Sequence, residues 1–314
     1  MKILVTGGAG FIGSHVADAL LASGHEVLIL DDLSTGRRAN VPARASFVQG
    51  DIRDADAVAK VFADFEPQVV THQAAQTSVA ISAREPLRDA EINVLGTLNI
   101  LQQAVKHKVE KLVFASTGGA IYGEVPDGER ATEERLPRPL SPYACSKFAV
   151  ENYLASYARE HGLRSNVLRY ANVYGPRQDP HGEAGVVAIF AQRVLAGEPI
   201  QINGRKQAGD DGCVRDYVYV SDVVKANLLA IEGKLAKSPV NVCTGIATST
   251  LELARALEQV AGVKASLTNG PRREGDVERS VLDPGSPPPL GAALPLLEGL
   301  TRTVAWFKAG KPAG

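Results

Sequence analysis

Tyr143 and Lys147 stand four residues apart in the segment Ser-Pro-Tyr-Ala-Cys-Ser-Lys. Ser141 suits the N-cap of a helix and Pro142 its first position, so the tyrosine and lysine would share one helix face. A free tyrosine has a pKa of about 10, but a nearby ammonium and a cationic cofactor both favour its phenolate. The pair could then take the proton of a hydroxyl group while hydride leaves the carbon that bears this hydroxyl. A solvated helix face carrying both residues by chance is the competing interpretation.

Two hydroxyl residues, Ser116 and Thr117, follow the run Lys111–Ala115, which we interpret as a strand. In open parallel sheets, ligands bind at the carboxyl ends of the strands, where these hydroxyls would lie. We expect Thr117 to hydrogen-bond both Tyr143 and the reacting oxygen, and Ser116 to support the cofactor. A strand-end turn closed by the hydroxyls is the alternative.

A glycine pattern, Gly7, Gly10 and Gly13, links the predicted strand Lys2–Thr6 to the predicted helix Phe11–Ala22. The first glycine permits a tight turn, the second lets the backbone approach a pyrophosphate, and the third lets helix and strand pack closely. The helix N-terminus also offers unpaired N–H groups to the anion. The first helical residues expected to meet this dinucleotide are Phe11 and Ile12.

An acidic pair, Asp31 and Asp32, follows the next predicted strand, Val27–Leu30. Asp31 comes eighteen residues after Gly13, where a carboxylate binds the adenosine ribose hydroxyls and would repel the 2′-phosphate of NADP. No lysine or arginine occurs between Asp31 and Arg37. We therefore expect NAD as the cofactor.

Two more predicted strands, Ser46–Val48 and Gln68–His72, lead to further cofactor residues. Asp51 could accept a hydrogen bond from the adenine amino group, with Ile52 against the ring, or could cap the following helix instead. His72 is expected to be a packed strand-end histidine rather than a base. The residues expected beside the ribose and nicotinamide are Gln73, Ala74 and Ala75.

Strands alternate with amphipathic helices through the first half of the chain, which is typical of a parallel sheet covered on both faces. We expect an α/β fold with a Rossmann doubly wound parallel sheet in residues 1–172 and a smaller α/β C-terminal substrate domain in 173–314. Within the second part, Val214–Val220 is predicted as one strand, Ser221-Asp222 as the cap of the next helix, and 216–243 as packing back on the first domain. Ser286–Pro289 is predicted to be a rigid linker before a last helix, about 297–308.

Composition narrows the possible partners. A net charge of −1 argues against a general nucleic-acid-binding surface. The three cysteines, Cys145, Cys213 and Cys243, form no paired framework, which favours free thiols in a reducing compartment. The chain runs from Met1-Lys2 straight into a strand and has no apolar run long enough to cross a bilayer. We expect a soluble cytoplasmic protein with no membrane partner and no metal site.

Six motifs together resemble the extended short-chain dehydrogenase/reductase family, and most closely its members that act on nucleotide sugars. They are TGGAGFIG (6–13), GDIRD (50–54), HQAAQTSV (72–79), STGGAIYGE (116–124), SPYACSK (141–147) and RYANVYGPRQ (169–178). The resemblance covers nearly the whole chain, to LLEGLTRTVAWF (296–307), and the motif set is specific for the superfamily. It implies a homodimer formed through the helices 93–107 and 143–161.

The resemblance also implies contacts for individual residues. Asn93 and Tyr170 would contact NAD, together with Tyr143 and Lys147. The implied substrate contacts are Asn172 and Arg215 at the diphosphate, Arg273 and Asp276 at phosphate and ribose, and Val186, Gln201 and Asn203 around the uracil and its ribose. Ser280, four residues after Asp276, would border the sugar C2 position and leave room for an acetamido group. Arg272 could simply be a surface charge.

The implied reaction is inversion at C4 of a UDP-hexose, which interconverts UDP-glucose and UDP-galactose through a 4-keto intermediate. UDP-N-acetylhexosamines could also fit. Gly118 and Gly119 follow Thr117, where the related 4,6-dehydratases carry Asp-Glu, so elimination would lack its acid and base. Epimerisation of UDP-glucuronate is the alternative within the class. A non-catalytic NAD-binding sensor is the alternative outside it, although the presence of both Tyr143 and Lys147 argues against a sensor.

Overall fold

The computed structural model describes residues 1–181, 185–273, 276–286 and 288–310. Its main feature is a seven-stranded sheet in the order β11-β6-β5-β4-β1-β2-β3, in which all neighbours are parallel. The strands are β1 (Lys2–Thr6), β2 (Glu26–Asp31), β3 (Ser46–Gln49), β4 (Val69–His72), β5 (Lys111–Thr117), β6 (Arg164–Tyr170) and β11 (Val240–Val242). The strand order reverses between β1 and β4, where doubly wound sheets open a ligand crevice. The predicted Rossmann sheet is confirmed.

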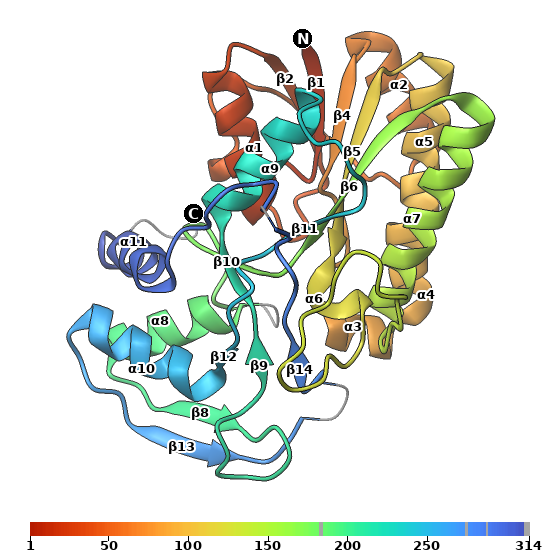
Figure 1. Cartoon of the computed structure of the whole chain (residues 1–314). Helices are drawn as coiled ribbons and strands as arrows, with labels where there is room; N and C mark the ends of the chain where they lie inside the picture. Colours follow the sequence, from red (N-terminus) through yellow and green to blue (C-terminus); the bar gives the residue numbers. More distant parts are fainter. Residues whose placement is uncertain (182–184, 274–275, 287, 311–314) are drawn as a thin grey trace.

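Helices cover both faces of this sheet (Figure 1). They are α1 (Phe11–Ala22) and α9 (Val220–Ile231) on one face, and α2 (Ala55–Phe65), α5 (Thr97–Lys106) and α7 (Pro142–His161) on the other. Successive side chains of a strand point to opposite faces. Ile3 and Val5 of β1 accordingly join the core beneath α1 and α9, while Leu4 joins the core beneath α2, α5 and α7. Burial on both faces explains why β1, β2 and β5 each carry a continuous apolar run.

Short helices gather near the carboxyl edge of the sheet. They are α3 (Val79–Arg84), α4 (Pro86–Ala90), the π-helical turn η2 (Glu91–Gly96), which continues into α5, and α6 (Gly118–Ile121). A further 3-10 turn, η1 (Arg38–Asn40), follows β2. Single π-helical turns are frequent at functional sites. Here the turn carries Asn93, one of the residues expected to contact the cofactor.

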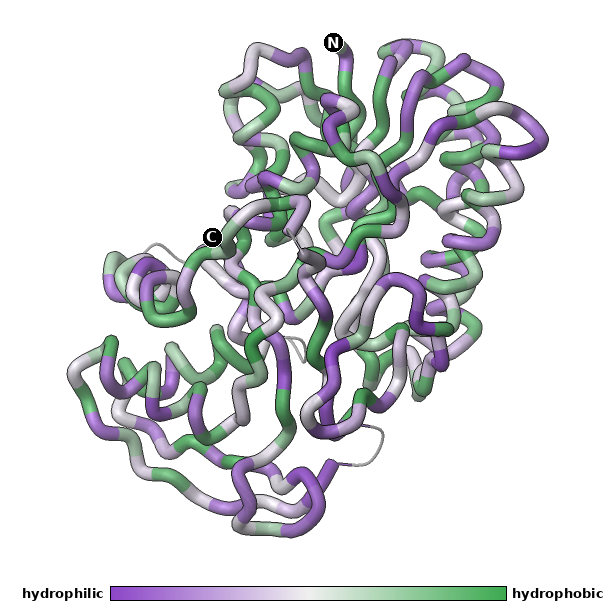
Figure 2. The backbone as a smooth tube through the Cα atoms, viewed as in Figure 1, coloured by the Kyte–Doolittle hydropathy of each residue, from purple (hydrophilic) through white to green (hydrophobic). Residues whose placement is uncertain are grey.

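A second unit with its own apolar core occupies the lower part of Figure 1. Its elements are α8 (Val186–Ala196), α10 (Thr250–Ala261), α11 (Leu296–Lys308) and the strand pair β8 (Ile200–Asn203) and β13 (Leu267–Gly270). Small sheets join it to the first unit: β12 (Thr248–Ser249), β9 (Val214–Arg215) and β14 (Arg279–Ser280) in one, β7 (Asn172–Tyr174) and β10 (Tyr217–Tyr219) in the other. The loop between β8 and β9, at the bottom of the view, is mainly hydrophilic in Figure 2. Between these elements, α9 lies beside α1 and β11 extends the large sheet.

Two local predictions for this region are wrong. Val214–Val220 is not one strand, because the ladder breaks at Asp216 between β9 and β10. At Asp216 the chain passes from one small sheet to the other, since its N–H donates to Ser280 and its carbonyl accepts from Asn172. Its buried carboxylate accepts from the backbone N–H groups of Thr244 and Gly245, both at 2.9 Å. Ser221-Asp222 does not cap the next helix: α9 begins at Val220 and has no side-chain cap.

The end of the chain agrees with the sequence where it is described. The last helix, α11, begins at Leu296, one residue earlier than predicted. The predicted linker Ser286–Pro289 includes Pro287, which lies outside the described residues. Among the helices of the described residues, none is long and apolar enough to cross a membrane.

Candidate active site

The glycine turn after β1 forms a cradle with no room for side chains. A Cβ on Gly13 would lie 2.1 Å from the carbonyl oxygen of Gly7, and a Cβ on Gly7 would lie 2.6 Å from the backbone nitrogen of Ala74. Gly7 also has a positive φ of 67°, which other residues rarely adopt. At the start of α1, Gly10 provides no side-chain cap, and Phe11 and Ile12 follow it. The cradle therefore presents bare backbone where a pyrophosphate would bind.

Asp31, at the end of β2, is nearly buried and holds the turn in shape. Its carboxylate accepts hydrogen bonds from the backbone N–H groups of Ala9 at 2.9 Å and Leu33 at 2.8 Å. Burial raises the pKa of this carboxyl. Each carboxylate oxygen has a second lone pair, so the group can still accept from a ribose hydroxyl. Asp32 is turned to its own loop, where it accepts from Ser34.

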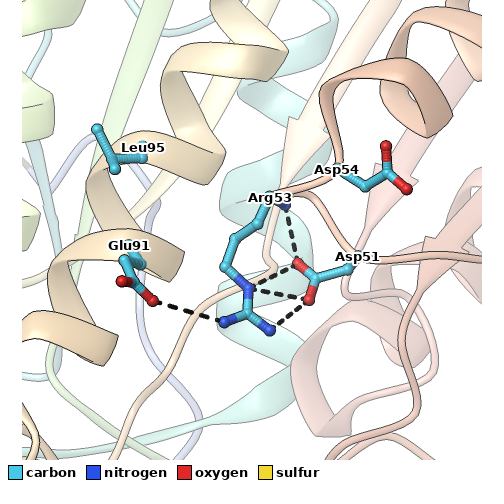
Figure 3. Close-up of a pocket in the computed structure, with 5 residues that line it drawn as sticks. All are labelled: Asp51, Arg53, Asp54, Glu91 and Leu95. Atoms are coloured by element: carbon cyan, nitrogen blue, oxygen red, sulfur yellow. Dashed lines mark hydrogen bonds and ion pairs between the residues drawn. The ribbon is translucent and has the colours of Figure 1, made fainter.

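A hollow at the end of β3 is lined by Asp51, Arg53, Asp54, Glu91 and Leu95 (Figure 3). Arg53 lies between two carboxylates, at 2.5 Å from Asp51 and 3.8 Å from Glu91. The helix that follows is capped by Asp54, whose side chain accepts from two backbone N–H groups, and not by Asp51. The Asp51 carboxylate instead accepts from the backbone N–H and the guanidinium of Arg53, so its contact with an adenine stays a prediction, and Ile52 is buried.

The end of β4 contributes both packing and polar groups. His72 is fully buried, with its ring nitrogens 2.6 Å from the Thr6 hydroxyl and 2.9 Å from that of Thr97. Burial lowers the pKa of His72 to about 3, so it is the neutral, packed histidine that the sequence indicated. Gln73 donates to Asn227 of α9 at 3.0 Å.

Tyr170, at the end of β6, joins the same polar group. Its hydroxyl donates to Gln73 at 3.4 Å and accepts from Asn227 at 2.8 Å. Asn227 is completely buried and was not among the expected site residues. It lies in a helix of ordinary apolar pattern, so no motif pointed to it. Ala74 and Ala75 continue the chain past this group, and the backbone of Ala74 faces the glycine cradle.

The catalytic pair predicted from the sequence lies against the end of β5. Ser141 caps α7 by accepting from the Ala144 N–H at 3.2 Å, and Pro142 is the first helical residue. Lys147 is buried and donates from Nζ to the carbonyl oxygen of Ala115 at 2.9 Å. The Thr117 side chain lies beside Tyr143 and favours its phenolate, as expected for the residue that would share the reacting oxygen.

Without a bound cofactor, the pKa values of Tyr143 and Lys147 differ from those expected from their spacing in the sequence. Burial raises the pKa of Tyr143 to about 12, and the interaction with Thr117 opposes that rise without cancelling it. Burial lowers the pKa of Lys147 to about 8, against the raising effect of the Asp89 and Glu151 carboxylates. The lysine therefore does not by itself produce a phenolate. The positive charge of a bound nicotinamide, which the sequence argument invoked together with the lysine, has to supply the rest.

Asn93 and Ser116, both expected at the cofactor, are engaged with protein groups. The Asn93 amide is buried, accepts from the Gln76 N–H at 2.9 Å, and donates to Asp89 at 3.0 Å and to the Ser146 hydroxyl at 3.2 Å. Ser116 donates to a carboxylate oxygen of Glu151 at 2.5 Å. Direct contact of either side chain with the cofactor stays a prediction.

The expected substrate residues form two groups. In the first, Asn172 donates from its backbone and its side chain to the Asp216 carbonyl, and Arg215 of β9 is the register partner of Ser280 in β14. Gly119 adjoins this group, because a Cβ there would lie 3.4 Å from the Asn172 amide nitrogen.

The second group lies on β8 and the loop after β13. The amides of Gln201 and Asn203 are 2.7 Å apart, and the Asn203 oxygen, in the amide orientation that satisfies both of its polar atoms, accepts from Arg273 Nε at 2.6 Å. The charges of Asp276 and Arg215 both act on the pKa of the Cys213 thiol, so both side chains lie near it. Val186 opens α8, just after residues 182–184, which lie outside the described part. Among the residues that the structure describes, no cluster of histidine, cysteine or acidic side chains could hold a metal ion.

A parallel sheet with a glycine cradle at its switch point and a tyrosine–lysine pair on the adjoining helix defines an NAD-dependent enzyme of the short-chain dehydrogenase/reductase type. The chain belongs to the NAD dependent epimerase/dehydratase family, whose model matches residues 3–243. The family resemblance drawn from the motifs is thus confirmed.

Individual relatives are similar over almost the whole chain. The UDP-glucose 4-epimerase of Mycolicibacterium smegmatis is 44% identical, with 98% of this chain and 99% of the relative covered. The crystal structure of the Thermus thermophilus UDP-glucose 4-epimerase in complex with NAD shares 52% identity and a TM-score of 0.94, covering 98% and 99% of the two chains. That of the Thermotoga maritima UDP-glucose 4-epimerase with UDP-glucose shares 47% identity and a TM-score of 0.92, covering 99% of each.

Proposed function

We propose that this chain is a UDP-glucose 4-epimerase that interconverts UDP-glucose and UDP-galactose with tightly bound NAD. The observation that carries the proposal is the placement of Tyr143 beside Thr117, on the same face of α7 as the buried Lys147, at the edge of the sheet that holds the glycine cradle. Full-length relatives with this activity in their names support it.

The residues present fit NAD. The cradle of Gly7 and Gly13 has no space for a Cβ and suits a pyrophosphate, while Asp31 suits ribose hydroxyls and opposes a 2′-phosphate. The hollow of Figure 3 lies at the strand end where the adenine is expected. Bound NAD supplies a hydride acceptor and donor for the sugar C4.

The chain's own residues supply the proton transfer and the anchoring. Tyr143 takes the proton of the 4-hydroxyl and returns it, Thr117 hydrogen-bonds the same oxygen, and Lys147 favours the phenolate through its charge. Arg215 and Arg273 hold the diphosphate, because guanidinium forks match phosphate oxygens. Since the binding energy lies on UDP, the 4-keto sugar can turn without leaving, and its other face then receives the hydride.

Elimination chemistry is not favoured at this site. Gly118 and Gly119, after Thr117, carry no acid or base, and a Cβ on Gly118 would lie 2.3 Å from a side-chain carbon of Leu282. Epimerisation of UDP-glucuronate needs no additional catalytic group and is the second candidate.

A product assay separates these candidates. Purified protein is incubated with UDP-glucose, UDP-N-acetylglucosamine and UDP-glucuronate in turn, and the C4 epimers are separated by chromatography. We expect UDP-galactose from UDP-glucose with no net change of NAD. Conversion of UDP-glucuronate alone would select the second candidate, and NAD binding without any product would indicate a sensor.

We also propose a cytoplasmic homodimer formed through α5, with the preceding η2, and α7. An exposed aromatic side chain supports this face, since 41% of Tyr153 in α7 is accessible. The three cysteines carry no disulfide, in keeping with a reducing compartment. Light scattering of the purified protein measures the mass directly.

A further inference from the structure

A buried ion pair lies beneath the catalytic residues. Arg169 of β6 donates to both carboxylate oxygens of Glu151 in α7, from Nε at 3.0 Å and from Nη2 at 2.6 Å. Only 5% and 8% of the two side chains are exposed. Taking two charges out of water costs about as much as their attraction returns, so a buried pair is weak evidence for a purely stabilising role. The reason for this ion pair is therefore sought in its position beside the catalytic residues.

The pair extends the catalytic face of α7 by one turn. Tyr143, Lys147 and Glu151 follow at spacings of four, which places them on one side of the helix. Each reaches one of the last three residues of β5: Tyr143 meets Thr117, Lys147 meets the Ala115 carbonyl, and Glu151 accepts from the Ser116 hydroxyl at 2.5 Å. The helix is thus attached residue by residue to the strand end that carries Thr117.

Glu151 attaches two strands at once. Ser116 and Arg169 are register partners in β5 and β6, so neighbouring side chains of both strands converge on one carboxylate. The other side of Arg169 is fixed as well, because Nη1 donates to the Tyr122 hydroxyl at 2.8 Å, which in turn donates to Asn241 at 2.9 Å. The guanidinium therefore holds Glu151 in one position, and Glu151 holds Ser116.

We propose that Glu151, fixed by Arg169, is a positioning residue for the epimerase reaction: through Ser116 it holds the end of β5 against α7, so that Thr117 and Lys147 stay aligned with Tyr143. The proposal rests on the proposed function. It gives the Ser116 hydroxyl an alignment role in place of the cofactor support expected from the sequence. Misplacing a reacting group by about an ångström can slow the chemical step about a hundredfold.

The test compares Ser116→Ala and Glu151→Gln with Glu160→Gln, an exposed glutamate in the last turn of the same helix. Ser116→Ala removes one hydrogen bond and leaves the ion pair intact, so it should fold even if Glu151→Gln does not. We measure kcat and KM for UDP-glucose, NAD content and melting temperature. We expect kcat to fall on the order of tenfold in Ser116→Ala, and further in Glu151→Gln. KM and NAD content should stay within about twofold of wild type in Ser116→Ala, because it leaves the UDP-binding residues unchanged. Glu160→Gln should behave as wild type.

Two results would overturn the proposal. One is wild-type kcat in Ser116→Ala. The other is a parallel loss of kcat, NAD content and melting temperature in Ser116→Ala, which would show only a folding role. An inactive wild type would instead refute the proposed function, so the two failures are distinguishable.

Discussion

The ammonium of Lys147 donates to the carbonyl oxygen of Ala115 at 2.9 Å, one residue before Ser116, whose hydroxyl donates to Glu151, and two before Thr117. This contact fixes the lysine charge at the strand edge where the tyrosine must ionise. Burial meanwhile lowers the pKa of Lys147 to about 8. The charge is therefore present below that pH and lost above it, so the lysine titrates within the range that an enzyme assay covers.

Lys147→Ala should reduce kcat on the order of a hundredfold and move the pH optimum upward. Without the ammonium, Tyr143 needs a higher pH to lose its proton, and the alkaline loss of activity caused by the lysine disappears. The pH dependence of kcat at saturating UDP-glucose measures both effects. An unchanged optimum in the variant would show that the lysine does not assist ionisation.

Cofactor choice should depend on Asp31. NAD should co-purify with wild type, and NADP should not replace it in stripped protein, because the buried carboxylate opposes a 2′-phosphate. Asp31→Ala should relax the preference, although it also leaves the Ala9 and Leu33 N–H groups without this acceptor. The ratio of activities restored by each cofactor is the measurement. Equal restoration of the wild type by both would contradict the assignment.

Two arginines should anchor UDP. Arg215→Ala and Arg273→Ala should each weaken UDP binding by about 2–3 kcal/mol, the usual cost of losing a charge-assisted hydrogen bond. Arg272→Ala is the matched control, since that neighbour pairs with Glu278 at 3.6 Å and is half exposed. Calorimetric titration with UDP gives the three affinities. If the control loses as much as the other two, the loss reflects general charge rather than a diphosphate contact.

Acid should destabilise the fold through His72. The pKa of His72 is lowered to about 3 in the folded protein by burial, below its unfolded value of about 6.5. The unfolded chain binds more protons between these values, so the stability contribution is present above pH 6.5 and is lost as pH falls toward 3. Linkage predicts a loss of about 2 kcal/mol between pH 7 and pH 5. Urea unfolding of wild type and His72→Gln measures it, and the variant should show a shallower decline.

Ser280 should permit acetamido sugars. It is buried in β14 beside Arg215, and serine is much smaller than the aromatic residue that would exclude an acetamido group. Wild type should therefore accept UDP-N-acetylgalactosamine as well as UDP-galactose, with a modest preference, because one methylene-sized difference discriminates by only about 1–3 kcal/mol. Ser280→Tyr should shift the ratio of kcat/KM values toward UDP-galactose. An unchanged ratio would place the sugar C2 position elsewhere.

The features that the sequence predicted well have local causes. The bounds of β1 and α1 agree with the structure, because the spacing of Gly7, Gly10 and Gly13 requires a strand, a tight turn and a helix in succession. Likewise, Ser141 and Pro142 determine where α7 begins, and the helix then brings Tyr143 and Lys147 to one face. Residues within one turn of each other decide these elements.

The features that were missed depend on contacts between distant parts of the chain. The break at Asp216 involves Ser280 and Asn172, which its backbone bonds in two different sheets. The side-chain partner of Ser116 lies in α7, and its register neighbour Arg169 lies in β6. The raised pKa of Tyr143 has a similar origin, since the spacing of Tyr143 and Lys147 gives no information on how deeply the fold buries them.

The position of β11 has a consequence for the order in which the protein can be made. β11 pairs with β6 although some seventy residues separate them in the chain. Asn227, which donates to the Tyr170 hydroxyl, is also synthesised well after β6. A chain emerging from the ribosome can begin to fold its first six sheet strands early. Until residue 242 has been synthesised, however, β6 remains a bare edge, which is the kind of surface on which unfinished chains associate. β11, the last strand of the large sheet to be synthesised, therefore protects the nascent protein as well as completing the cofactor-binding sheet.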